Sequence, residues 1–225
     1  MSEHSHKGDH EHGHANDQGF KAVLRYLRWA PQMWRSDINK AVLELVAPAP
    51  AETVLDIGAG MGPGTVLAAE TGATVVAVEP TPFMRRILTA RRLANPNRRR
   101  ITVVDGTAEK LPVPDGHIDA LWSVNAMHHW VDPEQAAVEI ARVLKPGGRV
   151  VLVDEDFTDP AHPDFERFGG GFGDHSDHSD GTHHGFTMVD AEQMGSLLLT
   201  AGFAEVDAAT RNLGQTPVIA ITGRR

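Results

Sequence analysis

Hydrophobic residues along the chain form short, β-branched-rich runs that alternate with longer segments of helical periodicity. Strands this short and this apolar are typical of a parallel sheet that is covered by helices on both faces. The five runs predict strands at residues 53–57, 74–78, 101–104, 118–123 and 149–154. Because crossovers between parallel strands are right-handed, the pattern predicts a doubly wound, Rossmann-like α/β fold.

Helical segments fill the spaces between the runs. Ile38, Val42 and Leu45 fall on one face of a predicted helix within residues 20–47, which ends at Pro48. Later helices are predicted to open at Pro63, to run from about Pro82 to Ala94 and from Pro133 to Leu144, and to follow Asp190. Residues 204–209 and 218–222 predict a closing hairpin. We therefore expect a mostly parallel seven-stranded sheet with an antiparallel C-terminal hairpin strand.

Two segments interrupt this rhythm. Residues 1–19 are polar, contain five histidines and offer almost nothing to bury, so we expect a disordered His-rich tail. Residues 157–188 are rich in Gly, His and Asp, and a loop of this length in a compact domain is typical of a functional lid or of a mobile segment. The rest, residues 20–225, is predicted to be a single domain, in which residues 20–50 form an N-terminal helical cap.

Composition and net charge indicate which binding partners and which cellular compartment to expect. The 225-residue chain has a net charge of −9, which argues against a nucleic-acid partner because phosphates require a basic surface. The run Arg98–Arg100 is interpreted as a solvated rim. No cysteine is present, and no apolar run approaches the roughly 20 residues of a membrane span. We expect a soluble, cytoplasmic protein without a membrane partner, and its oligomeric state stays open.

The segment at 54–65 carries the clearest chemical signal, because a strand leads into a glycine-rich turn and then a helix N-terminus. Glycines let the backbone turn tightly and approach a ligand closely, as in the nucleotide sites of α/β folds. The dinucleotide fingerprint G-x-G-x-x-G fails, since the frames from Gly58 and Gly60 both lack the last glycine. Asp56 would repel a pyrophosphate and favours a cationic ligand.

Glu79 stands at the end of the second predicted strand. A carboxylate at this position can accept hydrogen bonds from both hydroxyls of a ribose, as in related dinucleotide folds. The alternative is an ordinary solvated charge at a strand end. Because Glu79 occurs together with the glycine-rich turn, we favour the ribose-binding interpretation.

With these residues in place, the chain resembles the class I S-adenosylmethionine-dependent methyltransferases, and within them the small-molecule subgroup with the ubiquinone and menaquinone methyltransferases. The matching stretches are VLDIGAGMGPGT at 54–65, VVAVEPTPFM at 75–84, VVDGTAEKLPVPDGHIDALWS at 103–123 and ARVLKPGGRVVLVDE at 141–155. The resemblance implies S-adenosyl-L-methionine as cofactor and transfer of its methyl group to a small, ring-containing acceptor.

The resemblance also implies roles for residues around the glycine turn. Asp56 would lie near the ammonium group of the methionine moiety, with Gly58 and Gly60 lining the cofactor chain. Glu79 would hold the ribose hydroxyls.

Further cofactor contacts are implied on the adenine side. Pro80 and Met84 would pack near the adenine. Thr107 stands where the family usually has an aspartate that accepts from the adenine amino group, and the backbone of Ala108 could serve the same base. A hydroxyl accepts such a bond without the charge. Asn125 would contact the cofactor at the mouth of the acceptor site.

The loop after the fourth predicted strand contains His128 and His129, at the sheet edge where ligands bind in open α/β folds. A phenol, enol or amine acceptor loses a proton during methylation, and a histidine suits that task. A structural role common to the family is the alternative for both. An apolar wall for the acceptor would come from the aromatic residues Trp29, Trp34, Phe165, Phe168 and Phe172.

Three other functions stay open. Histidines in the tail and lid could bind a metal and make the enzyme metal-responsive or metal-dependent, although neither segment has the spacing of a structural zinc site. No metal ligands are therefore assigned. A nicotinamide (NAD(P)-binding) oxidoreductase conflicts with the missing fingerprint. A non-catalytic binding module would need neither the glycine turn nor Glu79.

Overall fold

The computed structural model describes residues 37–156, 158–162, 165, 190–214 and 216–225. The predicted tail, the cap before Asp37 and most of the lid lie outside the described residues, so these assignments stay predictions. The strands are β1 (Thr53–Ile57), β2 (Thr74–Val78), β3 (Ile101–Val104), β4 (Ile118–Val124), β5 (Leu144–Glu155), β6 (Ala204–Leu213) and β7 (Thr216–Arg224). The α-helices are α2 (Asp37–Val46), α3 (Pro63–Glu70), α4 (Pro82–Ala94), α5 (Pro133–Val143) and α7 (Ala191–Thr200).

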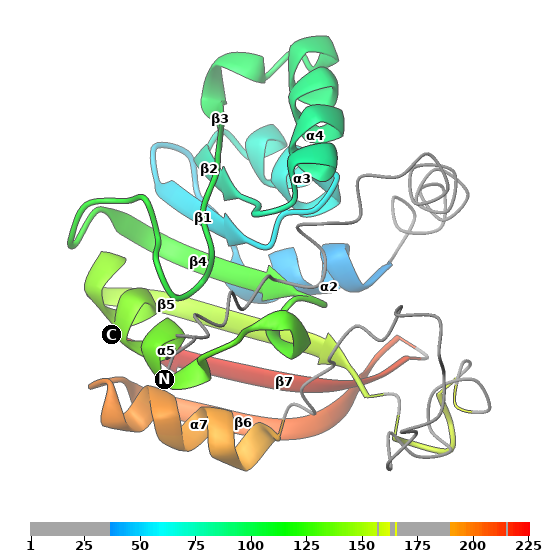
Figure 1. Ribbon diagram of the computed structural model, residues 1–225, viewed down its shortest axis with the longest axis vertical. Helices are drawn as coiled ribbons and strands as arrows, with labels where there is room; N and C mark the ends of the chain where they lie inside the picture. Colours follow the sequence, from blue (N-terminus) through cyan, green and yellow to red (C-terminus); the bar gives the residue numbers. More distant parts are fainter. Residues whose placement is uncertain (1–36, 157, 163–164, 166–189, 215) are drawn as a thin grey trace, which may run out of the picture.

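The strands form one seven-stranded sheet in the order β3-β2-β1-β4-β5-β7-β6 (Figure 1). Strands β1 to β5 are parallel, whereas β7 runs antiparallel to β5 and β6 antiparallel to β7. This confirms the predicted fold class. The strand order reverses between β1 and β4, and ligands of open α/β sheets bind at the carboxyl ends of strands beside such a reversal.

Successive residues of each strand point to opposite faces, which are covered by different helices (Figure 1). Leu55 and Ile57 belong to the core on the α5 and α7 side. Val54 and Trp122 belong to the core beneath α2 and α3. Both faces of the sheet are therefore buried, as the nearly continuous apolar runs indicated.

The structure changes some predicted boundaries. Strand β5 begins at Leu144, which pairs with Ile118 before a register shift, whereas the sequence predicted a start at Arg149. The closing hairpin is also longer than expected at both strands. Predicted helix starts agree well, and the Asp190 side chain accepts a hydrogen bond from the Gln193 N–H at 2.8 Å.

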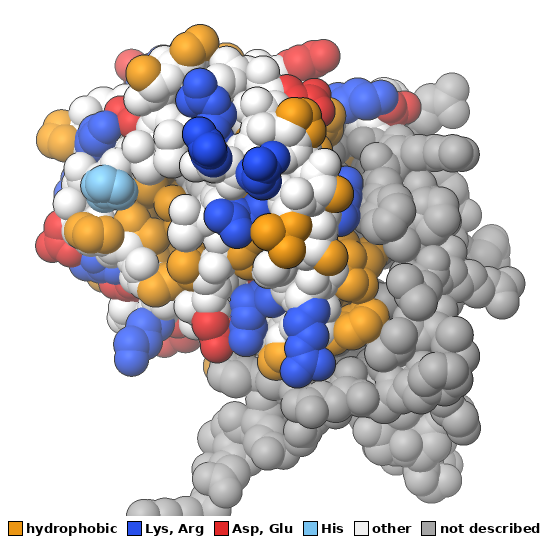
Figure 2. All heavy atoms as spheres, turned by 90° about the horizontal axis from the view of Figure 1, so that it is seen from above, with side chains coloured by type: hydrophobic (Ala, Val, Ile, Leu, Met, Phe, Trp, Pro, Cys, Tyr) orange, Lys and Arg blue, Asp and Glu red, His pale blue; other side chains and the backbone are white. Residues whose placement is uncertain are grey.

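Figure 2 views the end of the molecule that carries α4, where basic side chains lie close together. Seven arginines belong to α4 and to the following 3₁₀ helix η1 (Arg98–Arg100): Arg85, Arg86, Arg91, Arg92, Arg98, Arg99 and Arg100. No helix among the described residues is long and apolar enough to cross a membrane.

Candidate cofactor and acceptor site

The glycine turn after β1 lies between the end of β2 and the loop after β4. Gly58 has a φ of 68°, and a Cβ built on it would come within 2.5 Å of the Ala126 Cβ. Gly60 also has a positive φ, 54°, and its N–H donates to the Glu79 carboxylate at 2.8 Å. The turn therefore depends on glycine both for its backbone conformation and for this close approach.

Glu79 is buried at the end of β2, with 4% of its surface exposed. Its two carboxylate oxygens accept one backbone N–H each, from Gly60 at 2.8 Å and from Thr81 at 2.8 Å. Burial raises the pKa of Glu79, and the backbone hydrogen bonds oppose that rise. A carboxylate offers about four acceptor positions, so the fixed group can still accept two ribose hydroxyls.

Asp56, the fourth residue of β1, lies beneath the first turn of α3. It is buried, and its Oδ2 accepts a hydrogen bond from the Thr65 hydroxyl at 2.6 Å. A Cβ built on Gly64 would be 3.0 Å from Trp122 Nε1, 3.1 Å from Asn39 Oδ1 and 3.5 Å from Asp56 Oδ2. Polar atoms from α2, β1 and β4 therefore meet at one point under the turn.

The surroundings of Asp56 change its acidity. Burial, together with the nearby charge of Glu79, raises the pKa of Asp56 to about 7, although the hydrogen bond from Thr65 opposes the rise. Trp122 Nε1 is close enough to lower the pKa slightly, but it makes no hydrogen bond of ordinary geometry among the described residues. The predicted contact of Asp56 with an ammonium group stays a prediction.

The predicted adenine side lies at the start of α4. Pro80 is exposed, and the Met84 sulfur is 3.9 Å from a Cβ built on Gly60. Arg85 donates to the carbonyl oxygen of Glu79 at 2.7 Å and pairs with Asp105 at 2.8 Å. Met84 is thus next to the turn, and Asp105 is engaged by an arginine.

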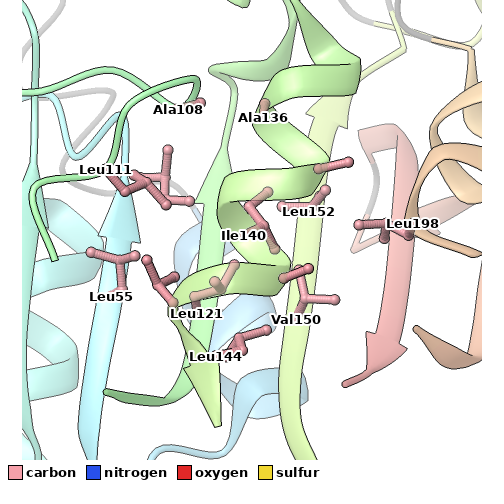
Figure 3. Packing of buried hydrophobic residues seen from close by; sticks show 14 of the residues in the cluster. Leu55, Ala108, Leu111, Leu121, Ala136, Ile140, Leu144, Val150, Leu152 and Leu198 are labelled. Carbon is pink, nitrogen blue, oxygen red and sulfur yellow. The ribbon is translucent and has the colours of Figure 1, made fainter. Parts of the chain in front are cut away.

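Thr107 and Ala108 belong to the loop between β3 and β4. Ala108 and Leu111 pack on the core beside α5 (Figure 3). The Leu111 N–H donates to the Glu139 carboxylate at 2.8 Å, which fixes the loop to α5. Thr107 is half-buried and forms an isolated bridge with Lys110. The loop is therefore held rigidly at the same sheet edge as Glu79.

Asn125 follows β4 with a left-handed backbone, φ 51°. Its side chain pairs reciprocally with Glu155 at the end of β5, donating to Oε1 at 2.6 Å and accepting from the Glu155 N–H at 2.9 Å. The other Glu155 oxygen lies 3.0 Å from Nε2 of the buried His162. Asn125 thus has both polar side-chain atoms engaged within the protein, and its cofactor contact stays a prediction.

Asp154 organises the next three residues of the same loop. Its Oδ1 accepts the N–H groups of Ala126 at 2.9 Å and Met127 at 3.3 Å. Its Oδ2 accepts the backbone N–H of His128 at 3.0 Å and lies 2.8 Å from the Nδ1 of the same residue. The His128 and His129 rings are 3.9 Å apart at 57°, and His129 is the more exposed.

Sequence reasoning assigned no role to Asp154, Glu155, Asn39 or His162. Asp154 and Glu155 are recognisable in the sequence as acids at the carboxyl end of a buried strand, the edge where Glu79 was found. Asn39 and His162 leave no such signal. Among the described residues no group of three or more histidines or carboxylates could hold a metal ion. The histidines of the tail and the predicted lid that prompted the metal hypothesis lie outside them.

Comparisons with known proteins agree on one class. Residues 55–152 match the family model described as a methyltransferase domain. An uncharacterized methyltransferase of Mycobacterium tuberculosis is 45% identical over 111 residues, 49% of this chain and 43% of that protein. The demethylmenaquinone methyltransferase of Clavibacter sepedonicus is 36% identical over 132 residues, 59% of this chain and 50% of that protein. The chain thus spans about half or less of these relatives.

Solved structures show the same fold. An S-adenosylmethionine-dependent methyltransferase from Thermotoga maritima superposes with a TM-score of 0.63 at 22% identity, over 91% of this chain and 96% of that one. A phosphoethanolamine N-methyltransferase of Haemonchus contortus, solved with S-adenosylhomocysteine, gives 0.66 at 17% identity, over 84% of this chain and 52% of that one.

Proposed function

We propose that the chain is a class I S-adenosylmethionine-dependent methyltransferase, which transfers the methyl group of this cofactor to a small, ring-containing molecule. The match of residues 55–152 to a methyltransferase domain and the methyltransferase relatives support this proposal. The observation that carries the proposal is the fixed Glu79 carboxylate, which is held by the Gly60 N–H of the glycine turn at 2.8 Å. When bound, the cofactor supplies an electrophilic methyl group on a sulfonium that leaves as a neutral thioether.

The chain's own residues would bind and orient the cofactor. Glu79 would accept the ribose hydroxyls, and the backbone at Gly58 and Gly60 would line the cofactor chain. Thr107 and Ala108, on the loop fixed to α5, would face the adenine. These groups belong to rigid strand ends and a short anchored loop, which suits the accurate alignment that methyl transfer requires.

Pro80, Met84, Asp56 and Asn125 complete the proposed set. Met84 lies beside Gly60 and could pack on the cofactor, with Pro80 at the exposed rim. Asp56 supports the turn from below through Thr65. Asn125 would shape the mouth through its pairing with Glu155.

Two observations support the proposal that the methyl acceptor is a small molecule. The relatives include a demethylmenaquinone methyltransferase, whose name specifies a ring-containing acceptor. The net charge of −9 disfavours a polyanionic acceptor. An O–H or N–H acceptor must also lose a proton, and His128 and His129 are the candidates to accept it.

Thermal unfolding tests the cofactor assignment. S-adenosylhomocysteine should raise the unfolding temperature of the full chain, because a ligand that binds only the folded state stabilises it. NADH should leave the temperature unchanged. If NADH raises the unfolding temperature and S-adenosylhomocysteine does not, the proposal is wrong and the chain is better described as a nicotinamide oxidoreductase.

Substitution of Glu79 tests the site itself. Glu79→Ala should weaken S-adenosylhomocysteine binding about 10- to 100-fold, the cost of losing hydrogen bonds to a charged group. Glu70→Ala, at the exposed end of α3, is the matched control and should bind like the unmodified chain. Calorimetric titration measures both. Equal affinity in Glu79→Ala would remove Glu79 from the ribose site.

A further inference from the structure

The end of β5 presents two consecutive carboxylates to the loop after β4. Glu155 pairs with Asn125, and Asp154 binds the three residues that follow. Asp154 also contacts the ring of a candidate proton acceptor, with its Oδ2 2.8 Å from His128 Nδ1. Asp154 therefore anchors the loop and also contacts a candidate proton acceptor, His128.

We infer that Asp154 is a positioning residue that fixes the tautomer and orientation of His128, so that the Nε2 of His128 accepts the proton of the methyl acceptor. The inference rests on the proposed function and extends it, since it names the nitrogen of His128 that accepts the proton and the carboxylate that orients the ring. Asp154 would act through His128 and would not touch either substrate.

The hydrogen-bond geometry determines the tautomer. An ionised carboxylate only accepts hydrogen bonds, so the Nδ1 of His128 must donate to Asp154 Oδ2. In neutral imidazole the lone pair then lies on Nε2. The same Oδ2 accepts the backbone N–H of His128, so one oxygen holds both the ring and its own main chain. Asp154 is 2% exposed, which keeps water from competing for these bonds.

The position of the loop relates this ring to the cofactor turn. Ala126 packs directly on Gly58, close enough that a Cβ on Gly58 would meet the Ala126 side chain at 2.5 Å. His128 is two residues further along the same anchored loop, and its side chain is 16% exposed. The ring is therefore partly accessible at the sheet edge where methyl transfer is proposed.

The proton step balances without another reactant. As the acceptor oxygen or nitrogen forms its bond to the methyl carbon, the carbon–sulfur bond breaks and its electrons stay on sulfur. The acceptor's O–H or N–H proton moves to Nε2 and gives an imidazolium. Water then removes this proton and restores the neutral ring. Asp154 keeps its own charge throughout and stabilises the imidazolium electrostatically.

Nitrogen NMR on the ¹⁵N-labelled full chain tests the positioning directly, with the His128 signals assigned by their loss in His128→Gln. We expect the Nδ1–H tautomer of neutral His128 in the unmodified chain and its loss in Asp154→Ala. Glu109→Gln is the matched control, because Glu109 accepts the N–H groups of Val131 and Asp132 and so anchors the same loop at different residues. It should keep the tautomer. An Nε2–H tautomer in the unmodified chain would overturn the inference.

Turnover tests the role of Nε2, measured as S-adenosylhomocysteine released with a panel of phenols and aromatic amines. His128→Gln should lower kcat about 100-fold, as expected for loss of a proton acceptor. Asp154→Asn should lower it by a similar factor, but by less than about 2-fold when His128→Gln is already present, because both act through one group. Independent, multiplying effects would reduce Asp154 to a loop anchor.

The two proposals fail in different ways. If S-adenosylhomocysteine does not bind the unmodified chain, the proposed function fails, while the tautomer experiment still decides the relation of Asp154 to His128. If the cofactor binds and turnover is normal in His128→Gln, the proposed function stands and the inference is wrong.

Discussion

At the scale of single residues, Asp56 is a buried carboxyl group, with 4% of its surface exposed. Its burial beneath α3 raises its pKa to about 7, while Thr65 supplies the hydrogen bond that a buried acid needs. An unfolded chain would release this proton near pH 4, the usual range for aspartate. The folded state therefore binds more protons than the unfolded state between about pH 4 and pH 7.

This difference predicts the pH dependence of stability at Asp56. The free energy of unfolding should fall as the pH rises through this window and stay reduced above it, by about 1.4 kcal/mol for each unit crossed. Asp56→Asn keeps an oxygen for Thr65 but has no charge. We compare the free energy of unfolding of Asp56→Asn with that of the unmodified chain at pH 5 and at pH 8, by urea unfolding. From pH 5 to pH 8 the difference should shift by about 2 kcal/mol in favour of Asp56→Asn.

Glu70→Gln is the control for this measurement, because Glu70 is exposed at the end of α3. Its difference from the unmodified chain should not vary between the two pH values. If the difference in free energy of unfolding between Asp56→Asn and the unmodified chain is also the same at both pH values, the pKa of Asp56 is not raised in the folded protein.

At the scale of elements, α5 connects the core to the adenine-side loop. One face of the helix buries Ile140 among side chains of β4 and β5, as Figure 3 shows. Its Glu139 and Arg142 bind the loop between β3 and β4, with Arg142 donating to the carbonyl oxygens of Val113 and Leu111 at 2.8 Å and 3.0 Å. Packing and polar contacts of one helix thus hold the loop in place.

Ile140→Ala should destabilise the fold by about 3 kcal/mol, because the truncated side chain leaves a cavity that the sheet cannot fill. Val138→Ala, on the same helix but 49% exposed, should change the free energy of unfolding by less than about 0.5 kcal/mol. Urea unfolding of both variants checks this. Similar losses in the two would contradict the assignment of the buried face.

At the scale of the whole molecule, charge is unevenly distributed. The chain is acidic overall, yet the end formed by α4 and η1 is basic (Figure 2). Several of these arginines bind the protein's own carbonyl groups, such as Arg91 to Met61 at 2.6 Å, Arg92 to Ile101 at 2.6 Å and Arg100 to Gly72 at 2.6 Å. Much of the positive charge therefore stabilises loops.

We expect no specific nucleic-acid binding at this end. Fluorescence anisotropy of a labelled single-stranded RNA should not rise with micromolar protein at about 0.15 M salt, because the net negative charge opposes a polyanion. A rise that disappears in Arg98→Ser/Arg99→Ser, two exposed positions of η1, would identify the basic end as a nucleic-acid surface.

The sequence by itself determined the type and order of the α-helices and strands that the structure describes, and it placed several candidate-site residues at one edge of the sheet. Hydrophobic runs, proline and glycine positions and the cap at Asp190 report local backbone conformation, so they predict strands, turns and helix starts directly. The same logic placed Gly60 and Glu79 at one edge, where the structure joins them by a hydrogen bond.

Only the tertiary structure decided which side chains meet across that edge. His128 and Asp154 are 26 positions apart, and their contact depends on the pairing of β4 with β5. The burial of Asp56 depends on α3, whose Thr65 hydroxyl donates to its carboxylate, and no local pattern reports this contact. Contacts of this kind follow from strand order and helix packing, and a periodic pattern in one segment carries no information about a partner in another.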